Sequence, residues 1–203
     1  MQRYLDPSDA ESAQALLIRH AKREPIRRGD SVWVAALTDE GREDARRYGE
    51  TLRPFAFGGV YSSPVPRCLE TARLLVEGWG YADAAVRTEQ FLLSAYVSNP
   101  SLAKNLFADS DPFQLILDQL DEDALPGFHT LENGSCAILN EIEGRATAGA
   151  LTLFVTHDAL IMPFRAFFLG DAYHRDSWLP FLGNAAIVLR KEGVFIDGKH
   201  VER

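Results

Sequence analysis

Short apolar runs alternate along this chain with longer segments of helical pattern, and this alternation constrains the fold most. The runs typical of short buried strands cover residues 15–18, 59–62, 84–88 and 151–156. Helices are predicted between and after them, over residues 39–53, 66–77, 131–148 and 159–169. Because strands that alternate with helices form layered sheets, the sequence predicts an α/β fold, a three-layer α/β/α sandwich with a largely parallel central sheet.

The residue types at the element ends support these boundaries. Thr38 is a typical N-cap for the first helix, and Pro66 is favoured at the first position of the second. Gly78 and Gly80 are expected to end this second helix after about residue 77. Two further strands, over 185–190 and 194–196, are expected to close the sheet as a hairpin.

The length of the chain indicates how many domains it forms. It has 203 residues, of which 46% are hydrophobic and 25% charged, which suffices for one buried core. A single domain over 1–203 is therefore predicted. Residues 91–130 are irregular, with several prolines around two short predicted helices at 101–107 and 112–120. This segment is expected to be a small inserted cap.

Charge and cysteine content disfavour several classes of function. The formal net charge is −8, which argues against a nucleic-acid binder because such proteins neutralise phosphates with Lys and Arg. Cys68 and Cys136 lie far apart and form neither a disulfide framework nor a zinc pattern, so neither a metal nor another cofactor is predicted. The polar amino terminus, and the lack of a run of about 18 apolar residues, predict a soluble cytoplasmic protein without membrane contact. The oligomeric state cannot be deduced.

Reactive side chains follow the predicted strands. They are Arg19 and His20 after the first strand, Arg67 close behind the second, and His157 and Asp158 after the strand 151–156. Ligands of open α/β sheets bind beyond the carboxyl ends of the strands, so these residues are expected to converge on one site.

The chemistry that these residues suit best is phosphoryl transfer. It needs a nucleophile, fixed positive charge on the phosphate oxygens and a proton for the leaving oxygen. Neutral histidine has a free ring lone pair, which suits His20 as nucleophile. Arginine donates two parallel hydrogen bonds to oxyanions, and the candidates are Arg19, Arg23 and Arg67. Residues 19–28 hold five Lys or Arg against one Glu, and the remaining cations there are expected to be solvated: Lys22, Arg27 and Arg28.

Four blocks of the sequence resemble those of the histidine phosphatase superfamily. They cover residues 17–20, 37–41, 60–72 and 155–157. The blocks occur in the family's order across most of the chain, each at a predicted strand end or helix start. The resemblance implies a phosphoglycerate mutase-like fold.

The resemblance also implies roles for the matched residues. His20 would be the phosphorylated nucleophile, Arg19 and Arg67 would bind phosphate oxygens, and His157 would be the second histidine beside the phosphoryl group. Ala21 departs from the family, which usually has glycine after the first histidine. The small alanine should fit unless the backbone needs a positive φ there.

The proton donor distinguishes the two branches of the superfamily. The mutase-like branch has a Glu after the third strand, where this chain is apolar. The acid-phosphatase branch continues its first motif with a second arginine and a proline, here Arg23 and Pro25, and places an Asp after the second histidine, here Asp158. Asp158 is therefore predicted to protonate the leaving group and then to activate water, with Glu89 as the alternative donor.

Together these features predict a metal-independent phosphomonoesterase that hydrolyses a small phosphorylated metabolite through a phosphohistidine on His20. A phosphomutase, a protein phosphohistidine phosphatase and a noncatalytic module that binds a phosphorylated ligand are the alternatives. The substrate cannot be deduced, because specificity in this family lies in loops and caps, here 91–130 and 173–184.

Overall fold

The computed structural model describes residues 3–201 except 27–32, 110 and 124. These residues form a seven-stranded sheet in the order β3-β2-β4-β1-β5-β6-β7. Its strands are β1 (Ala13–Arg19), β2 (Phe57–Ser62), β3 (Arg87–Thr88), β4 (Leu151–Thr156), β5 (Asn184–Arg190), β6 (Gly193–Ile196) and β7 (Lys199–Val201). Strands β3, β2, β4 and β1 are parallel, whereas β5, β6 and β7 pair antiparallel. The α/β prediction is confirmed, with a parallel sheet core and an antiparallel edge that includes the predicted hairpin.

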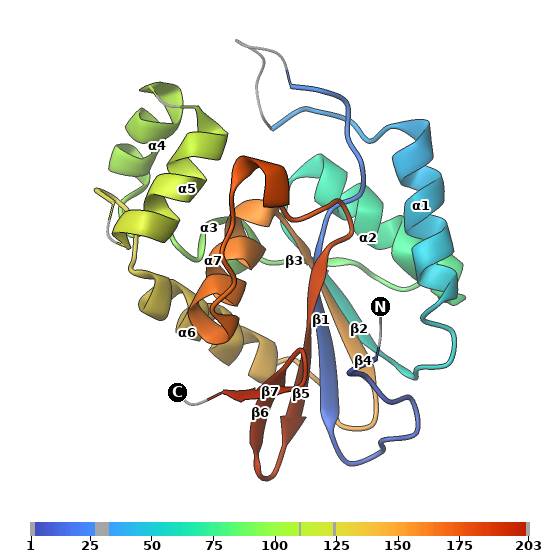
Figure 1. Ribbon diagram of the computed structural model, residues 1–203. Helices are drawn as coiled ribbons and strands as arrows, with labels where there is room; N and C mark the ends of the chain where they lie inside the picture. The colour runs from blue at the N-terminus through green and yellow to red at the C-terminus, as the bar shows by residue number, and fades with distance from the viewer. Residues whose placement is uncertain (1–2, 27–32, 110, 124, 202–203) are drawn as a thin grey trace.

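Helices cover both faces of the sheet (Figure 1). They are α1 (Asp39–Glu50), α2 (Pro66–Trp79), α3 (Phe91–Ser94), α4 (Pro100–Asp109), α5 (Pro112–Glu122), α6 (Leu131–Glu143), α7 (Asp158–Leu169) and the short 3-10 helix η1 (Arg175–Ser177). Helices α1 and α2 lie on one face, and α6 and α7 lie on the other (Figure 1). The predicted three layers are therefore present.

The strand sequences explain why both faces are covered. In β1, Leu16 and Ile18 point into the core beneath α1 and α2, whereas Leu17 points into the core beneath α6 and α7. In β4, Val155 and Phe154 divide between the two cores in the same way. Because successive side chains of a strand point to opposite faces, strands that are apolar throughout need helices on both.

Gly78 lies inside α2, so the predicted helix end just before it is wrong. The helix continues to Trp79, and the second glycine of the prediction, Gly80, is its C-cap with a φ of +101°. A Cβ atom on Gly78 would lie 2.0 Å from the carbonyl oxygen of Arg46 in α1, and one on Gly49 would lie 2.2 Å from that of Leu75 in α2. The two glycines thus allow the backbones of α1 and α2 to approach closely.

Other boundaries differ from the sequence predictions in length. Strand β3 has two residues instead of the predicted five, because it lies at the sheet edge and pairs only with the last two residues of β2. Helix α6 ends at Glu143 instead of residue 148, where Gly144 follows as its C-cap. The sequence did not indicate α3 or β7, which are only four and three residues long and show no periodicity.

Residues 91–130 divide into two parts. Leu92 and Tyr96, in and just after α3, are buried in the core, where the Tyr96 hydroxyl lies 2.7 Å from Ser135 Oγ on α6. Helices α4 and α5 instead pack beside each other, away from the sheet (Figure 1). The role of this helix pair as a cap stays a prediction.

Candidate active site

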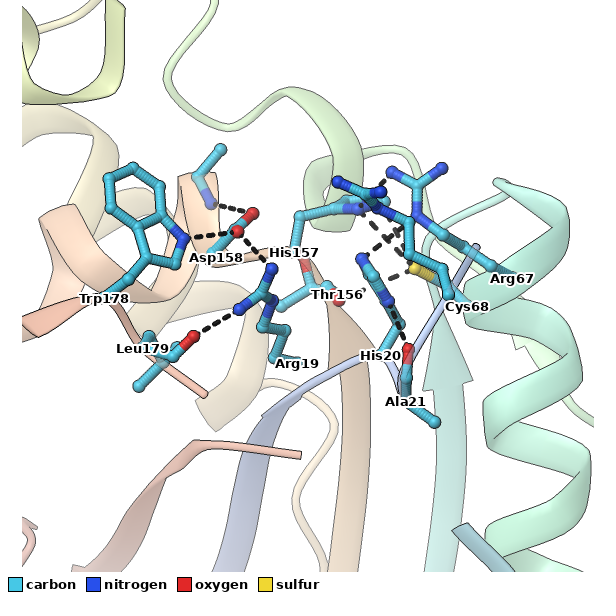
Figure 2. Close-up of polar contacts among 12 residues, drawn as sticks. Arg19, His20, Ala21, Arg67, Cys68, Thr156, His157, Asp158, Trp178 and Leu179 are labelled. Atoms are coloured by element: carbon cyan, nitrogen blue, oxygen red, sulfur yellow. Dashed lines mark hydrogen bonds and ion pairs between the residues drawn. The ribbon is translucent and has the colours of Figure 1, made fainter. Parts of the chain in front are cut away.

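The carboxyl ends of β1 and β4 bring the predicted site residues together. Arg19 ends β1 opposite Thr156 of β4, and His20 and His157 directly follow these two residues. The two imidazole rings lie edge to face, with their centroids 5.5 Å apart. Arg67, the second residue of α2, extends to both rings (Figure 2).

Two contacts determine which nitrogen of His20 carries the proton. Arg67 Nε donates to His20 Nε2 at 3.0 Å, and a guanidinium can only donate, so Nε2 carries the lone pair. The proton is then on Nδ1, which donates to the carbonyl oxygen of Ala21 at 2.8 Å. Burial, the neighbouring His157 and the charge of Arg67 lower the pKa of His20 well below its usual value. His20 is thus a neutral imidazole with a lone pair on Nε2.

Ala21 fits without strain in the place where the family usually has glycine. Among the described residues, the non-glycine residues with positive φ lie elsewhere, at Asp123, Leu182 and Asp197. The Ala21 side chain is fully buried. Its amide donates to Thr71 Oγ1 at 3.1 Å.

His157 has the opposite tautomer. Its Nδ1 accepts from Arg67 Nη2 at 3.1 Å, so its proton is on Nε2, which donates to Ser63 Oγ at 3.0 Å. Burial and the Arg67 charge lower the pKa of His157 to about 3. The Cys68 thiol also lies 3.5 Å from Nε2, but burial raises its pKa to about 12. Cys68 is therefore a neutral packing residue.

Arg19 and Asp158 form a nearly buried ion pair beside the two histidines. Arg19 Nη2 lies 2.6 Å from Asp158 Oδ2, and Trp178 Nε1 donates to the same oxygen at 2.8 Å (Figure 2). Arg19 Nη1 donates to the carbonyl of Leu179, and the guanidinium carbon lies 4.3 Å from the centre of the Phe181 ring. Arg19 Nε is buried and has no hydrogen-bond partner among the described residues.

The pKa of Asp158 reflects opposing effects. Burial raises it, whereas the charge of Arg19 and the hydrogen bond from Trp178 lower it. The net result is a pKa below the usual value of a carboxyl group. Asp158 is thus an ionised carboxylate held by three donors, because the Ala159 amide also donates to its Oδ1 at 3.0 Å.

Of the other predicted cations, Lys22 and Arg23 are more exposed than Arg19 and Arg67. Arg23 is half-buried, and Nη1 donates to the carbonyl of Glu24 at 2.9 Å. Burial lowers its pKa and the charge of Asp158 raises it, which places its guanidinium within electrostatic range of that carboxylate. Lys22 pairs with Glu40 on α1, with a largely exposed ammonium group. Arg27 and Arg28 lie outside the described residues.

Glu89, the alternative proton donor, has another partner. Both of its carboxylate oxygens lie 3.2 Å from Arg145, just beyond the end of α6. None of the side-chain hydrogen bonds described above for the two histidines and Arg19 involves Glu89.

Sequence reasoning missed four contributors to this site. Ser63 directly follows β2, and this position could have indicated it as a site residue. Trp178, Leu179 and Phe181 belong to the segment 173–184, which was predicted only as a region of substrate specificity. The sequence carries no signal for them, since a backbone carbonyl, an indole N–H and an aromatic ring serve many structural purposes.

Metal-binding clusters and membrane-spanning helices were also sought among the described residues. No group of three or more His, Cys, Asp or Glu side chains in this part of the chain is arranged to hold a metal ion. None of its helices has the length and apolar character needed to span a membrane.

Comparisons with known proteins place this geometry in context. The family model of the histidine phosphatase superfamily (branch 1) matches residues 15–92. The phosphoglycerate mutase of Bacillus anthracis superimposes with a TM-score of 0.65 at 17% identity, covering 97% of this chain and 95% of that one. This similarity shows that the chain has the fold of that phosphoglycerate mutase.

Other proteins with this fold include phosphatases. A mycobacterial glucosyl-3-phosphoglycerate phosphatase superimposes with a TM-score of 0.61 at 16% identity, over 94% of this chain and all of that one. YhfR of Bacillus stearothermophilus superimposes with a TM-score of 0.64 at 18% identity, covering 92% of this chain and 96% of that one. No curated protein matches the sequence. The branch 1 match ends before His157 and Asp158, so it does not bear on the acid-phosphatase feature predicted from Asp158.

Proposed function

We propose that this protein hydrolyses phosphate monoesters of small metabolites by transferring the phosphoryl group to His20. The observation that carries the proposal is the arrangement of His20: Nδ1 is fixed by the Ala21 carbonyl, and the Nε2 lone pair faces the guanidinium of Arg67 beside His157. A neutral imidazole with a fixed proton and an adjacent cation suits nucleophilic attack on phosphorus.

In the first step, the substrate phosphate takes the N–H donors of Arg67 that now contact the two histidines. This frees the His20 lone pair, because phosphate oxygens are stronger acceptors for a guanidinium than imidazole nitrogens. Buried Arg19 Nε, which is without a partner in the described residues, is a further donor available to the phosphate. Arg23, which interacts electrostatically with Asp158, would contribute further positive charge.

The second step forms a bond between His20 Nε2 and phosphorus while the ester P–O bond breaks. The leaving oxygen takes a proton from Asp158, which must therefore be protonated when substrate is bound. A phosphate dianion would supply the reason, because it attracts Arg19 away from the carboxylate and adds negative charge nearby, and both changes raise the pKa of Asp158.

In the third step, water attacks the phosphohistidine, Asp158 takes the water proton, and inorganic phosphate leaves His20. Asp158 thus donates one proton and recovers one in each cycle. Glu89 is a weaker candidate for both roles because Arg145 holds both of its oxygens.

A phosphomutase is the second candidate, favoured by the similarity in fold to the phosphoglycerate mutase of Bacillus anthracis. It would need a donor carboxylate and groups for a second anion. The contacts of Glu89 with Arg145 speak against this candidate. A protein phosphohistidine phosphatase would use the same His20 chemistry on a larger substrate.

The test is hydrolysis of p-nitrophenyl phosphate in the presence of EDTA. Wild-type protein and His200→Ala should be active, since His200 is exposed on β7, whereas His20→Ala should be inactive. Full activity of His20→Ala would refute the proposal. Incubation with phosphoglycerates and with phosphorylated carrier proteins, followed by product analysis, would separate the mutase and protein phosphatase from the metabolite phosphatase.

A further inference from the structure

The segment between α7 and β5 forms one wall of the site. Trp178 donates its indole N–H to Asp158, the Leu179 carbonyl accepts from Arg19, and the Phe181 ring lies over the Arg19 guanidinium. Phe181 also approaches the His20 ring, with 5.7 Å between centroids. A hydrogen bond to Asp158, a hydrogen bond from Arg19 and a ring contact with Arg19 therefore hold this ion pair from one side.

The same segment is attached to α5 at two points. The rings of Trp178 and Phe113 pack edge to face with centroids 5.0 Å apart. Arg175 Nη2 lies 2.7 Å from Asp111, the N-cap of α5, and 3.3 Å from Gln114 Oε1. Phe113 is 40% exposed, so one side of this aromatic pair is open to solvent.

We propose that Trp178 is a positioning residue that couples helix α5 to the Asp158 carboxylate, and through it to Arg19. The indole N–H fixes the oxygen that Arg19 also binds, and Phe113 fixes the indole ring. A change in the position of α5, as when a substrate group packs on Phe113, is thereby transmitted to the carboxylate. The proposal rests on the proposed function in taking Asp158 as the proton donor.

Several groups surround the Asp158 carboxylate, and the effect of Trp178 on its protonation has a defined direction. An N–H that donates to the ionised form stabilises that form, so loss of the donor favours protonation of Asp158. The charged and titratable groups facing Asp158 from the packed elements are Arg19 and His20 from the end of β1, Arg23 from the following loop, Arg67 from α2, and His157. All of these remain in a Trp178 variant.

The experiment compares Trp178→Phe with Trp79→Phe. Both variants lose an indole N–H but keep an aromatic ring, and Trp79 donates to the Phe55 carbonyl at 3.1 Å beneath the other face of the sheet. In Trp178→Phe, the carboxyl of Asp158, followed by carbon-13 NMR, should titrate about one pH unit higher than in the wild type. The basic limb of kcat/KM for phenyl phosphate, which requires a protonated donor, should shift upward equally. Trp79→Phe should change neither.

A second variant, Phe113→Leu, keeps the indole N–H and removes its ring support. It should shift the Asp158 titration in the same direction by a smaller amount. An unchanged titration in Trp178→Phe would overturn the coupling. If Trp178→Phe failed to fold, an unchanged titration in Phe113→Leu would overturn it. Failure of the proposed function would differ, because the titration would shift while wild-type protein showed no hydrolysis.

Discussion

Replacement of His157 by Gln should flatten the dependence of stability on acid pH. In the folded protein, burial and Arg67 lower the pKa of His157 to about 3, whereas the unfolded chain has a histidine pKa of about 6.5. The unfolded state therefore binds a proton below about pH 6.5 that the folded state excludes, so the folded state loses stability as the pH falls. Above about pH 6.5, neither state is protonated and the full stability remains.

The size of this effect follows from the two pKa values. Each pH unit below the unfolded pKa costs about 1.4 kcal/mol for one histidine that stays neutral in the fold. When the pH falls from about 7.5 to about 5, His157 should thus lower the free energy of unfolding by about 2 kcal/mol. Because pH 5 lies well above the folded pKa, this figure does not depend on its exact value.

The assay is urea unfolding followed by circular dichroism at both pH values. His157→Gln will be less stable than the wild type near neutrality, since it loses the contacts with Ser63 and Arg67. Its further loss of stability on acidification should be smaller than that of the wild type by about 2 kcal/mol. Equal losses in the two proteins would show that His157 is not held neutral, and the account of the site electrostatics would fail.

Three further substitutions probe other parts of the account. Asp158→Asn should reduce kcat/KM about 100-fold more for phenyl phosphate than for p-nitrophenyl phosphate, because the poorer leaving group depends on a general acid; equal reductions would remove Asp158 from that role. Gly78→Ala should lower the unfolding free energy by about 1–3 kcal/mol in urea titrations, because its Cβ atom would lie 2.0 Å from the Arg46 carbonyl, and an unchanged midpoint would contradict the close helix contact. Ser63→Ala leaves the His157 Nε2–H without its acceptor and should lower kcat, whereas Ser63→Thr should restore it; similar kcat values in both would argue against this hydrogen bond.

The elements of the fold with strong periodicity could be predicted from the sequence. Residues 151–156 form a strand with the predicted limits, and Thr38 caps α1 by accepting from the Gly41 amide. Gly78 shows where local reasoning fails. A glycine near a helix end is typically a stop signal, but here it is needed for the contact with α1, which no local pattern reveals.

Some residues of the site could likewise be predicted from the sequence, and others could not. Residues delivered directly by strand ends, such as His20 and His157, could be predicted because parallel strands bring their carboxyl ends to one edge. Trp178 could not, because its position depends on how the segment after α7 folds back and packs on α5. The ion pair of Asp158 with Arg19 also depends on tertiary geometry, although both residues had been selected individually.

The central claim is that His20 accepts the phosphoryl group, and trapping of the intermediate tests it most directly. Protein mixed briefly with phosphorus-32-labelled substrate and denatured in alkali should retain label in a bond that survives alkali and is lost in acid, as a phosphohistidine requires. Peptide mapping should place the label on His20, and His20→Ala should retain none. Label on any other residue, or undiminished label in His20→Ala, would contradict the account.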